Sequence, residues 1–183
     1  MKTTRDEVMK EGEEEKLRIS FVKMHHLLAQ HRGTFLSLMS LIEANIDSVL
    51  SDYFCSYDSE KMNEIKYILF ATNKISLSSK RQILMSIIKK NYDEFQKKYS
   101  SLESELIALF KRRNIFAHER FVFSDDRIKG FDGENLYLKN YREKSGQLFT
   151  EEIHLNGDII KSYGSKVDEI IGWLKELNQL VKT

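Results

Sequence analysis

Three polar residues in the second half of the chain have the types and spacing that phosphate chemistry on RNA requires. The segment 113–118 reads RNIFAH and contains Arg113, Asn114 and His118. An imidazole titrates near neutral pH, so it can take the proton of a ribose 2′-OH or give one to the leaving 5′-oxygen. A guanidinium offers several N–H donors to the scissile phosphate and to the charge that builds up on it. An asparagine can hold the phosphate or fix the imidazole tautomer. Together these are the parts of a ribonuclease that needs no metal.

The same segment closes a predicted amphipathic helix. Arg113 falls on the apolar stripe that Leu106 and Phe110 begin, where a buried guanidinium would need a partner or a ligand. Asn114 and His118 are four residues apart and lie on the adjacent helix face. The segment offers only one imidazole and one guanidinium, whereas the reaction needs two proton transfers. A two-fold dimer that brings two such helix ends together would double the set.

Segment 113–118 resembles the R-N-x-x-x-H signature of the HEPN superfamily. These are small helical proteins, often ribonucleases of toxin–antitoxin, abortive-infection and RNA-processing systems. The long helix rich in Phe, Leu and Ile before the motif, and the Ser-Ser-Lys80 start of the next helix, are also similar to HEPN proteins with a strand insert after the motif. The likeness in layout runs from about Leu27 to the C-terminus.

The resemblance implies a homodimeric, metal-independent endoribonuclease that leaves a 2′,3′-cyclic phosphate and uses no cofactor. RNA is the expected substrate, and an antitoxin or a nucleotidyltransferase is an expected kind of partner. Carried over by position, Arg113 binds phosphate, His118 transfers protons and Asn114 orients them. The alternative within the same family is a non-catalytic module that binds RNA, a nucleotide or a partner protein.

HEPN proteins often add an acidic or polar residue from the preceding long helix. Glu43, isolated among apolar residues, is the candidate here, and Asn45 and Asp47 are less favoured. In one subgroup, toxins are silenced by nucleotidyl transfer to a tyrosine two residues after the histidine. This chain has Arg120 at that position, so we do not expect that mode of control.

Positive charge is concentrated before the motif. Residues 74–113 contain ten basic and four acidic residues, although the whole chain has a formal charge of only +1. A local excess of this kind can attract a phosphate backbone even when the whole protein is nearly neutral. The candidate RNA contacts are Lys80, Lys111, Arg112 and Arg120. The alternative is that these residues only solvate the helix faces.

Structural roles compete with the catalytic ones. Arg113 could pair with Glu43 across the bundle, and His118 could sit at a helix C-terminus only because a cation is favoured there. His25, His26 and His31 do not share one helix face, which argues against a zinc site among them. The chain has a single cysteine, so a Cys-based zinc site within one chain is excluded. We therefore expect no metal and no cofactor.

The length of 183 residues fits a single domain over 1–183, with residues 1–16 as a frayed or solvated helical arm. Apolar spacing predicts a mainly α protein, a bundle of about four to five helices. The first long helix starts near Leu17, and Gly33 could bend or divide it. Ser78 or Ser79 is the expected N-cap of a later helix.

A β-insert is expected over residues 120–156, as a small β-hairpin or meander before a C-terminal helix. Strands are predicted at 120–123, 135–138 and 147–155, with turns at 124–126 and 144–146. The aromatic residues of the insert could stack bases or cover the bundle, and core packing is favoured. They are Phe121, Phe123, Tyr137, Tyr141 and Phe149.

Membrane and secretory signals are absent from the sequence. No apolar run approaches the ~18 residues that a membrane helix needs, and the charged N-terminus lacks the apolar region of a signal peptide. We therefore expect a cytoplasmic protein that does not bind membranes.

Overall fold

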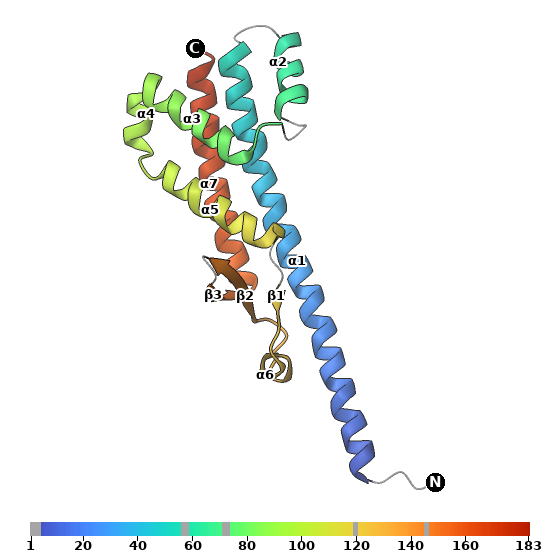
Figure 1. Cartoon of the computed structure of the whole chain (residues 1–183). Helices are drawn as coiled ribbons and strands as arrows, with labels where there is room; N and C mark the ends of the chain where they lie inside the picture. Colours follow the sequence, from blue (N-terminus) through green and yellow to red (C-terminus); the bar gives the residue numbers. More distant parts are fainter. Residues whose placement is uncertain (1–4, 56–58, 71–73, 119–120, 145–146) are drawn as a thin grey trace. The chain divides into compact units, whose positions relative to one another are not determined.

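The computed structural model describes residues 5–55, 59–70, 74–118, 121–144 and 147–183. These residues are mostly helical, with a small antiparallel sheet before the last helix (Figure 1), as predicted. They form two compact units. The first unit comprises residues 1–34 and 118–162, and the second comprises 35–117 and 163–183.

Helix α1 (Arg5–Cys55) is a single helix of 51 residues. The predicted division of the helix at Gly33 was wrong, because α1 runs through this position without interruption. A glycine inside a helix costs only about 1 kcal/mol relative to alanine, which is small for a helix of 51 residues. The helix also starts well before Leu17, and residues 12–16 are helical and exposed, as expected of a solvated arm.

The remaining helices of the second unit are short, apart from the last one. They are α2 (Ser59–Ile65), the π-helix η1 (Lys66–Phe70), α3 (Leu77–Asn91), α4 (Asp93–Lys98), α5 (Leu102–His118) and, from Tyr163 onward, α7 (Gly157–Val181). The N-cap of α3 is Ser76, not Ser78 or Ser79, and its Oγ accepts a hydrogen bond from the backbone N–H of Ser79.

Aromatic and aliphatic side chains form the core of the second unit. The rings of Phe35 on α1 and Phe116 on α5 lie 5.0 Å apart and are both fully buried. Trp173 on α7 stacks on Tyr99, just after α4, with ring centroids 5.0 Å apart. The first contact joins α5 to α1, and the second joins the end of α4 to α7.

The sheet belongs to the first unit. Its strands are β1 (Phe121–Val122), β2 (Leu136–Lys144) and β3 (Gln147–Leu155), in the order β1-β2-β3. Strand β3 has the predicted bounds, whereas β2 extends six residues beyond the predicted strand. Where a turn was predicted at 124–126, the short helix α6 (Asp125–Lys129) begins after Ser124. Residues 145 and 146 of the predicted hairpin turn lie outside the described residues.

The predicted core role of the aromatic residues in the insert is only partly correct. Phe123 is buried and makes edge contacts with the rings of Phe21 and His25 on α1. Tyr141 and Phe149 are instead 44% and 50% exposed. They lie toward the turn end of the hairpin, beyond the buried pairs that start with Leu136↔Leu155. The side chain of Phe121 lies outside the described residues.

Candidate functional site: a basic cleft between α3 and α5

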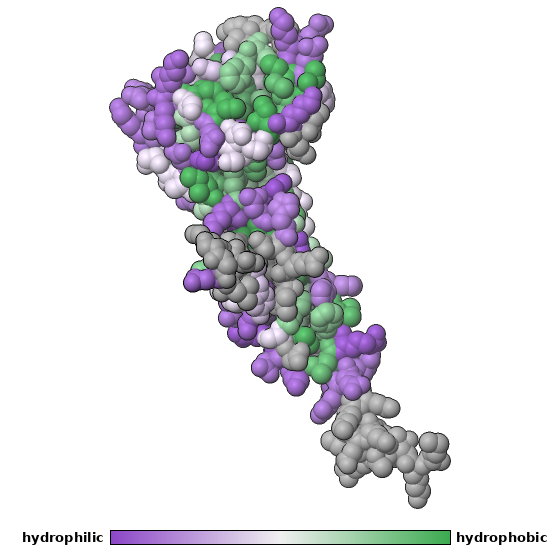
Figure 2. Space-filling view, in the orientation of Figure 1, coloured by the Kyte–Doolittle hydropathy of each residue, from purple (hydrophilic) through white to green (hydrophobic). Residues whose placement is uncertain are grey.

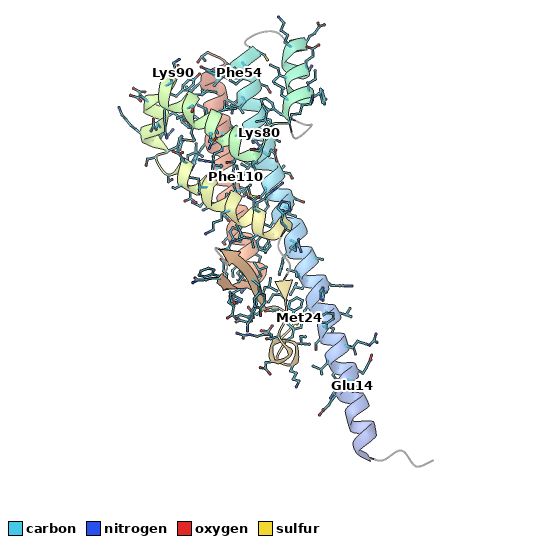
Figure 3. The ribbon with its side chains drawn as sticks, viewed as in Figure 1. Glu14, Met24, Phe54, Lys80, Lys90 and Phe110 are labelled. Carbon is cyan, nitrogen blue, oxygen red and sulfur yellow. The ribbon has the colours of Figure 1, made fainter. Side chains whose placement is uncertain are left out.

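A cleft of about 340 Å³ lies between the start of α3 and the outer side of α5, within the second unit. We call it the α3–α5 cleft. Its apolar wall is formed by Leu77, Ile107 and Phe110, the last of which is labelled in Figure 3. Its polar wall is formed by Ser76, Ser78, Arg81, Lys111, Arg113 and Asn114. The first two residues of the RNIFAH motif therefore line a cavity.

The packing of α5 explains why Arg113 reaches this cleft. The buried side of α5 includes Leu106, Leu109 and Phe116, whereas Arg113 is only half-buried. The predicted apolar stripe through Arg113 is thus displaced, and Arg113 lies at the edge of the buried face. Its Nη1 donates to Oδ1 of Asn114 at 3.3 Å. The guanidinium needs no buried partner there, and the amide nitrogen of Asn114 takes no part in this bond.

The cleft is electropositive. Arg81, Lys111 and Arg113 line it, and no aspartate or glutamate is among the described residues that do. Ser76 and Ser78 belong to the first turn of α3, where backbone N–H groups and the helix dipole favour an anion. Arginine donors and a helix N-terminus on one cavity suit a phosphate group.

One acidic residue lies behind the cleft and holds Arg81. Nη1 of Arg81 donates to Oε1 of Glu103 at 3.3 Å, and Nζ of Lys89 donates to Oε2 of Glu103 at 2.9 Å. Lys89, and to a lesser extent Arg81, hold the pKa of Glu103 below its ordinary value. Glu103 therefore stays ionised and orients Arg81 between α3 and α5.

His118 is the last residue of α5 and is exposed. Asn114 is four residues earlier on the same helix and belongs to the second unit, whereas His118 belongs to the first unit. The described residues that line the cleft include no histidine and no carboxylate. Proton transfer would therefore need a residue such as His118, and that role stays a prediction.

Lys80 does not lie on the RNA-accessible surface, so its prediction as an RNA contact was wrong. Its side chain has no exposed area. Its Nζ donates to Oε1 of Glu43 at 2.8 Å, to Oδ2 of Asp47 at 3.0 Å and to the carbonyl oxygen of Phe70 at 3.2 Å. The predicted alternative of an Arg113–Glu43 pair was also wrong, because Glu43 pairs with Lys80. A catalytic role for Glu43 remains only a prediction.

The other predicted RNA contacts have different positions. Lys111 is exposed and lines the cleft, whereas Arg112 is half-buried and is not among the residues that line it. Arg120 lies outside the described residues. Part of the positive excess is neutralised by ion pairs such as Lys98–Glu176, and hydrophilic residues cover the outer side of α4 (Figure 2).

Sequence reasoning missed Arg81, Ser76 and Ser78. Arg81 was part of the basic excess, but nothing in its local spacing distinguished it from the neighbouring lysines. These residues join the motif only because α3 packs against α5, which is a contact between distant segments. The available signal was the start of α3 about one turn before Arg81. The sequence analysis placed the N-cap of α3 at Ser78 or Ser79, two or three residues after the observed N-cap, Ser76.

A second cavity, in the first unit, carries a buried histidine. The cavity has a volume of about 340 Å³, and its lining includes His31, Glu134, Asn156, Asp158 and Lys161. His31 is 7% exposed, and among the described residues no hydrogen-bond partner is found for its Nε2. Burial lowers the pKa of His31 below its ordinary value. The folded protein therefore resists protonation of this ring.

We expect the stability of the protein to fall as the pH is lowered through about 6.5, the ordinary pKa of histidine. Below that pH the unfolded chain binds a proton at residue 31 that the folded chain excludes, so protons favour unfolding. The variant His31→Leu should have a flatter dependence of the free energy of unfolding on pH between 7.5 and 5.5, measured by urea denaturation. Parallel pH profiles for variant and wild type would contradict this prediction.

The described residues contain no group of three or more His, Cys, Asp or Glu side chains that could hold a metal ion. In the same part of the chain, every helix is too short or too polar to cross a membrane. No family model, curated protein or solved structure matches this chain. The likeness to HEPN proteins therefore depends on residues 113–118 and on the helical layout.

Proposed function

We propose that this protein is a metal-independent endoribonuclease that binds the scissile phosphate of RNA in the α3–α5 cleft. The observation that carries the proposal is that Arg113 and Asn114 of the RNIFAH motif line the same cavity as Arg81 and Lys111. Three cations around about 340 Å³ suit a nucleotide phosphate, and the apolar wall gives the rest of a nucleotide a surface to contact.

The reaction needs two proton transfers and one substitution at phosphorus. The ribose 2′-oxygen loses its proton and bonds to phosphorus, and the P–O5′ bond breaks as the 5′-oxygen gains a proton. The products are a 2′,3′-cyclic phosphate and a free 5′-hydroxyl, so no water is consumed. Arg113 and Arg81 stabilise the charge on the phosphoryl oxygens, Asn114 orients the phosphate, and His118 transfers protons.

A homodimer would supply the second proton-transfer group. A chain carries one RNIFAH motif and therefore one His118. In a two-fold dimer the same surface of each chain faces its copy, so two histidines can serve as base and acid. We propose this arrangement, and a measured monomer that is fully active would exclude it.

One observation favours a second candidate function, a module that binds RNA without cutting it. The described residues of the cleft wall include three cationic side chains and no histidine. Such a cleft suffices for binding. The two candidates differ in whether His118 is needed, because only cleavage requires a group that gains and loses a proton.

The test is an RNA cleavage assay with purified protein, mixed cellular RNA and EDTA. The proposal predicts cleavage in EDTA and products with 2′,3′-cyclic phosphate ends. If the protein binds RNA but does not cleave it, even with one protein dimer per RNA molecule, the result would support the binding module instead. Absence of both binding and cleavage would exclude both candidates.

Arg113→Ala should weaken RNA binding by about 10- to 100-fold, because a hydrogen bond to a charged group contributes about 1.5–3 kcal/mol. Cleavage should fall at least as much. Arg113→Lys keeps the charge but loses the planar donors, so we expect an intermediate affinity. The matched control is Lys97→Ala, which removes an exposed charge on α4 outside the cleft. Fluorescence anisotropy with a labelled RNA measures each dissociation constant, and equal losses for Arg113→Ala and Lys97→Ala would contradict the assignment.

A further inference from the structure

The buried ammonium of Lys80 is fully satisfied by groups from two other segments of the second unit. An ammonium has three N–H donors, and here each has an acceptor: Glu43 and Asp47 on α1, and the carbonyl of Phe70 at the end of η1. Figure 3 labels Lys80 near the start of α3, beside α1. The side chain thus connects α3 to α1 and to the segment that precedes α3.

Burying this charged cluster has an unfavourable free energy of desolvation. Taking an ammonium out of water carries a desolvation penalty that its partners only partly recover, and apolar replacements are often as stable. The cluster also has a net charge of −1, because two carboxylates surround one ammonium. Stability alone therefore does not account well for a lysine at this position. Directional ion pairs can instead select one register of packing, as buried polar groups do in some proteins.

The part of α3 that Lys80 fixes is the wall of the α3–α5 cleft. The backbone N–H of Lys80 donates to the carbonyl of Ser76 at 2.9 Å, which closes the first turn of the helix. That turn carries Ser76 and Ser78, and the next residue, Arg81, also lines the cleft. The backbone of Lys80 thus closes the turn, and its side chain anchors the turn to α1.

We propose that Lys80 is a positioning residue for the α3–α5 cleft: its ion pairs with Glu43 and Asp47 set the rotation of the first turn of α3, and thereby the placement of Ser76, Ser78 and Arg81 for RNA. This inference rests on the proposed function of the cleft. It also gives Glu43 a role different from the catalytic one that the sequence predicted, since Glu43 acts through Lys80.

The test separates positioning from both charge and stability. The triple variant Glu43→Gln/Asp47→Asn/Lys80→Met replaces a cluster of charge −1 by a neutral one of similar volume. Long-range electrostatics alone would leave RNA affinity unchanged or tighten it, because negative charge is removed. Positioning predicts the opposite, an affinity at least tenfold weaker with a melting temperature close to that of the wild type. The control Lys90→Met removes an exposed charge near the other end of α3 (Figure 3) and should change affinity by less than threefold.

A milder variant keeps the test decisive if the triple variant does not fold. Asp47→Asn removes one negative charge and replaces one of the two carboxylate oxygens by an amide nitrogen that cannot accept, but it leaves the Lys80–Glu43 pair. Positioning predicts RNA binding about threefold weaker, whereas electrostatics predicts equal or tighter binding. Two results would overturn the positioning role of Lys80: wild-type RNA affinity in the folded triple variant, or unchanged or tighter RNA binding by Asp47→Asn. If Arg113→Ala still weakens RNA binding, these results leave the proposed function of the cleft intact. If the wild type binds RNA independently of Arg113, the proposed function fails and this inference fails with it.

Discussion

Replacing His118 by alanine should reduce RNA cleavage by a factor of about 10² to 10⁴, the usual contribution of a general acid or base, and leave RNA affinity within about twofold. The reason is that the proposed phosphate site uses the cations that line the α3–α5 cleft, which do not include His118, whereas the proposed proton transfers depend on His118. Single-turnover cleavage of a labelled RNA in EDTA, with anisotropy on the same RNA, measures the two quantities separately.

The control for this prediction is His26→Ala, which removes an exposed histidine from α1 and should leave the cleavage rate unchanged. Circular dichroism should show the same helix content for both variants, because His118 is exposed at the end of α5. Equal cleavage by wild type and His118→Ala would mean that the activity comes from another site or from a contaminant. Loss of binding together with cleavage would move His118 from proton transfer to RNA binding.

Lys80→Met should lower the free energy of unfolding by about 3 kcal/mol, the lower end of the range for breaking a buried ion pair. The variant leaves Glu43 and Asp47, one turn apart on α1, without the ammonium between them. The carboxylates keep some access to water, with side chains 27% and 18% exposed, which limits the loss. For a chain of this length, we expect the melting temperature to fall by about 6–12 °C.

Thermal melts followed by circular dichroism measure this effect, and Lys90→Met is again the matched control. Lys90 lies on α3 with an exposed side chain, so its loss should change stability by less than about 0.5 kcal/mol. Adding Glu43→Gln and Asp47→Asn to Lys80→Met should restore most of the stability, because no uncompensated charge remains. A single variant that melts with the wild type would show that the cluster contributes no net stability.

Much of the fold could be predicted from local patterns. Helical spacing predicted the mainly helical fold, although not short helices such as α6, and strand β3 was predicted with the observed bounds. The insert was expected to end at residue 156, and α7 begins at Gly157, where Oδ1 of Asn156 accepts a hydrogen bond from the backbone N–H of Ile159. These elements were predictable because their signals lie within a few residues of one another.

Interactions between distant segments could not be predicted in this way. Lys80 and Arg81 are neighbours in a basic stretch, yet one is fully buried against α1 and the other lines a cleft with α5. Their different environments follow from the two helices that pack against α3, and local composition contains no information about either. The same reason explains the incorrect Arg113–Glu43 pair, since the partner of Glu43 is 37 residues away in sequence.

The two units are interleaved along the chain, and this order constrains how the protein is made. The second unit takes Val167, Ile170, Leu174 and Leu177 from α7, all of them fully buried, and these residues follow every strand of the first unit in sequence. A ribosome synthesises about 5–20 residues per second from the N-terminus, so the helices on both sides of the α3–α5 cleft emerge seconds before α7 completes their core. The nascent chain therefore passes through a period in which the RNIFAH motif already exists but the cleft has no finished scaffold. If the proposed RNA cleavage depends on the finished cleft, this order delays that activity until the ribosome has translated α7.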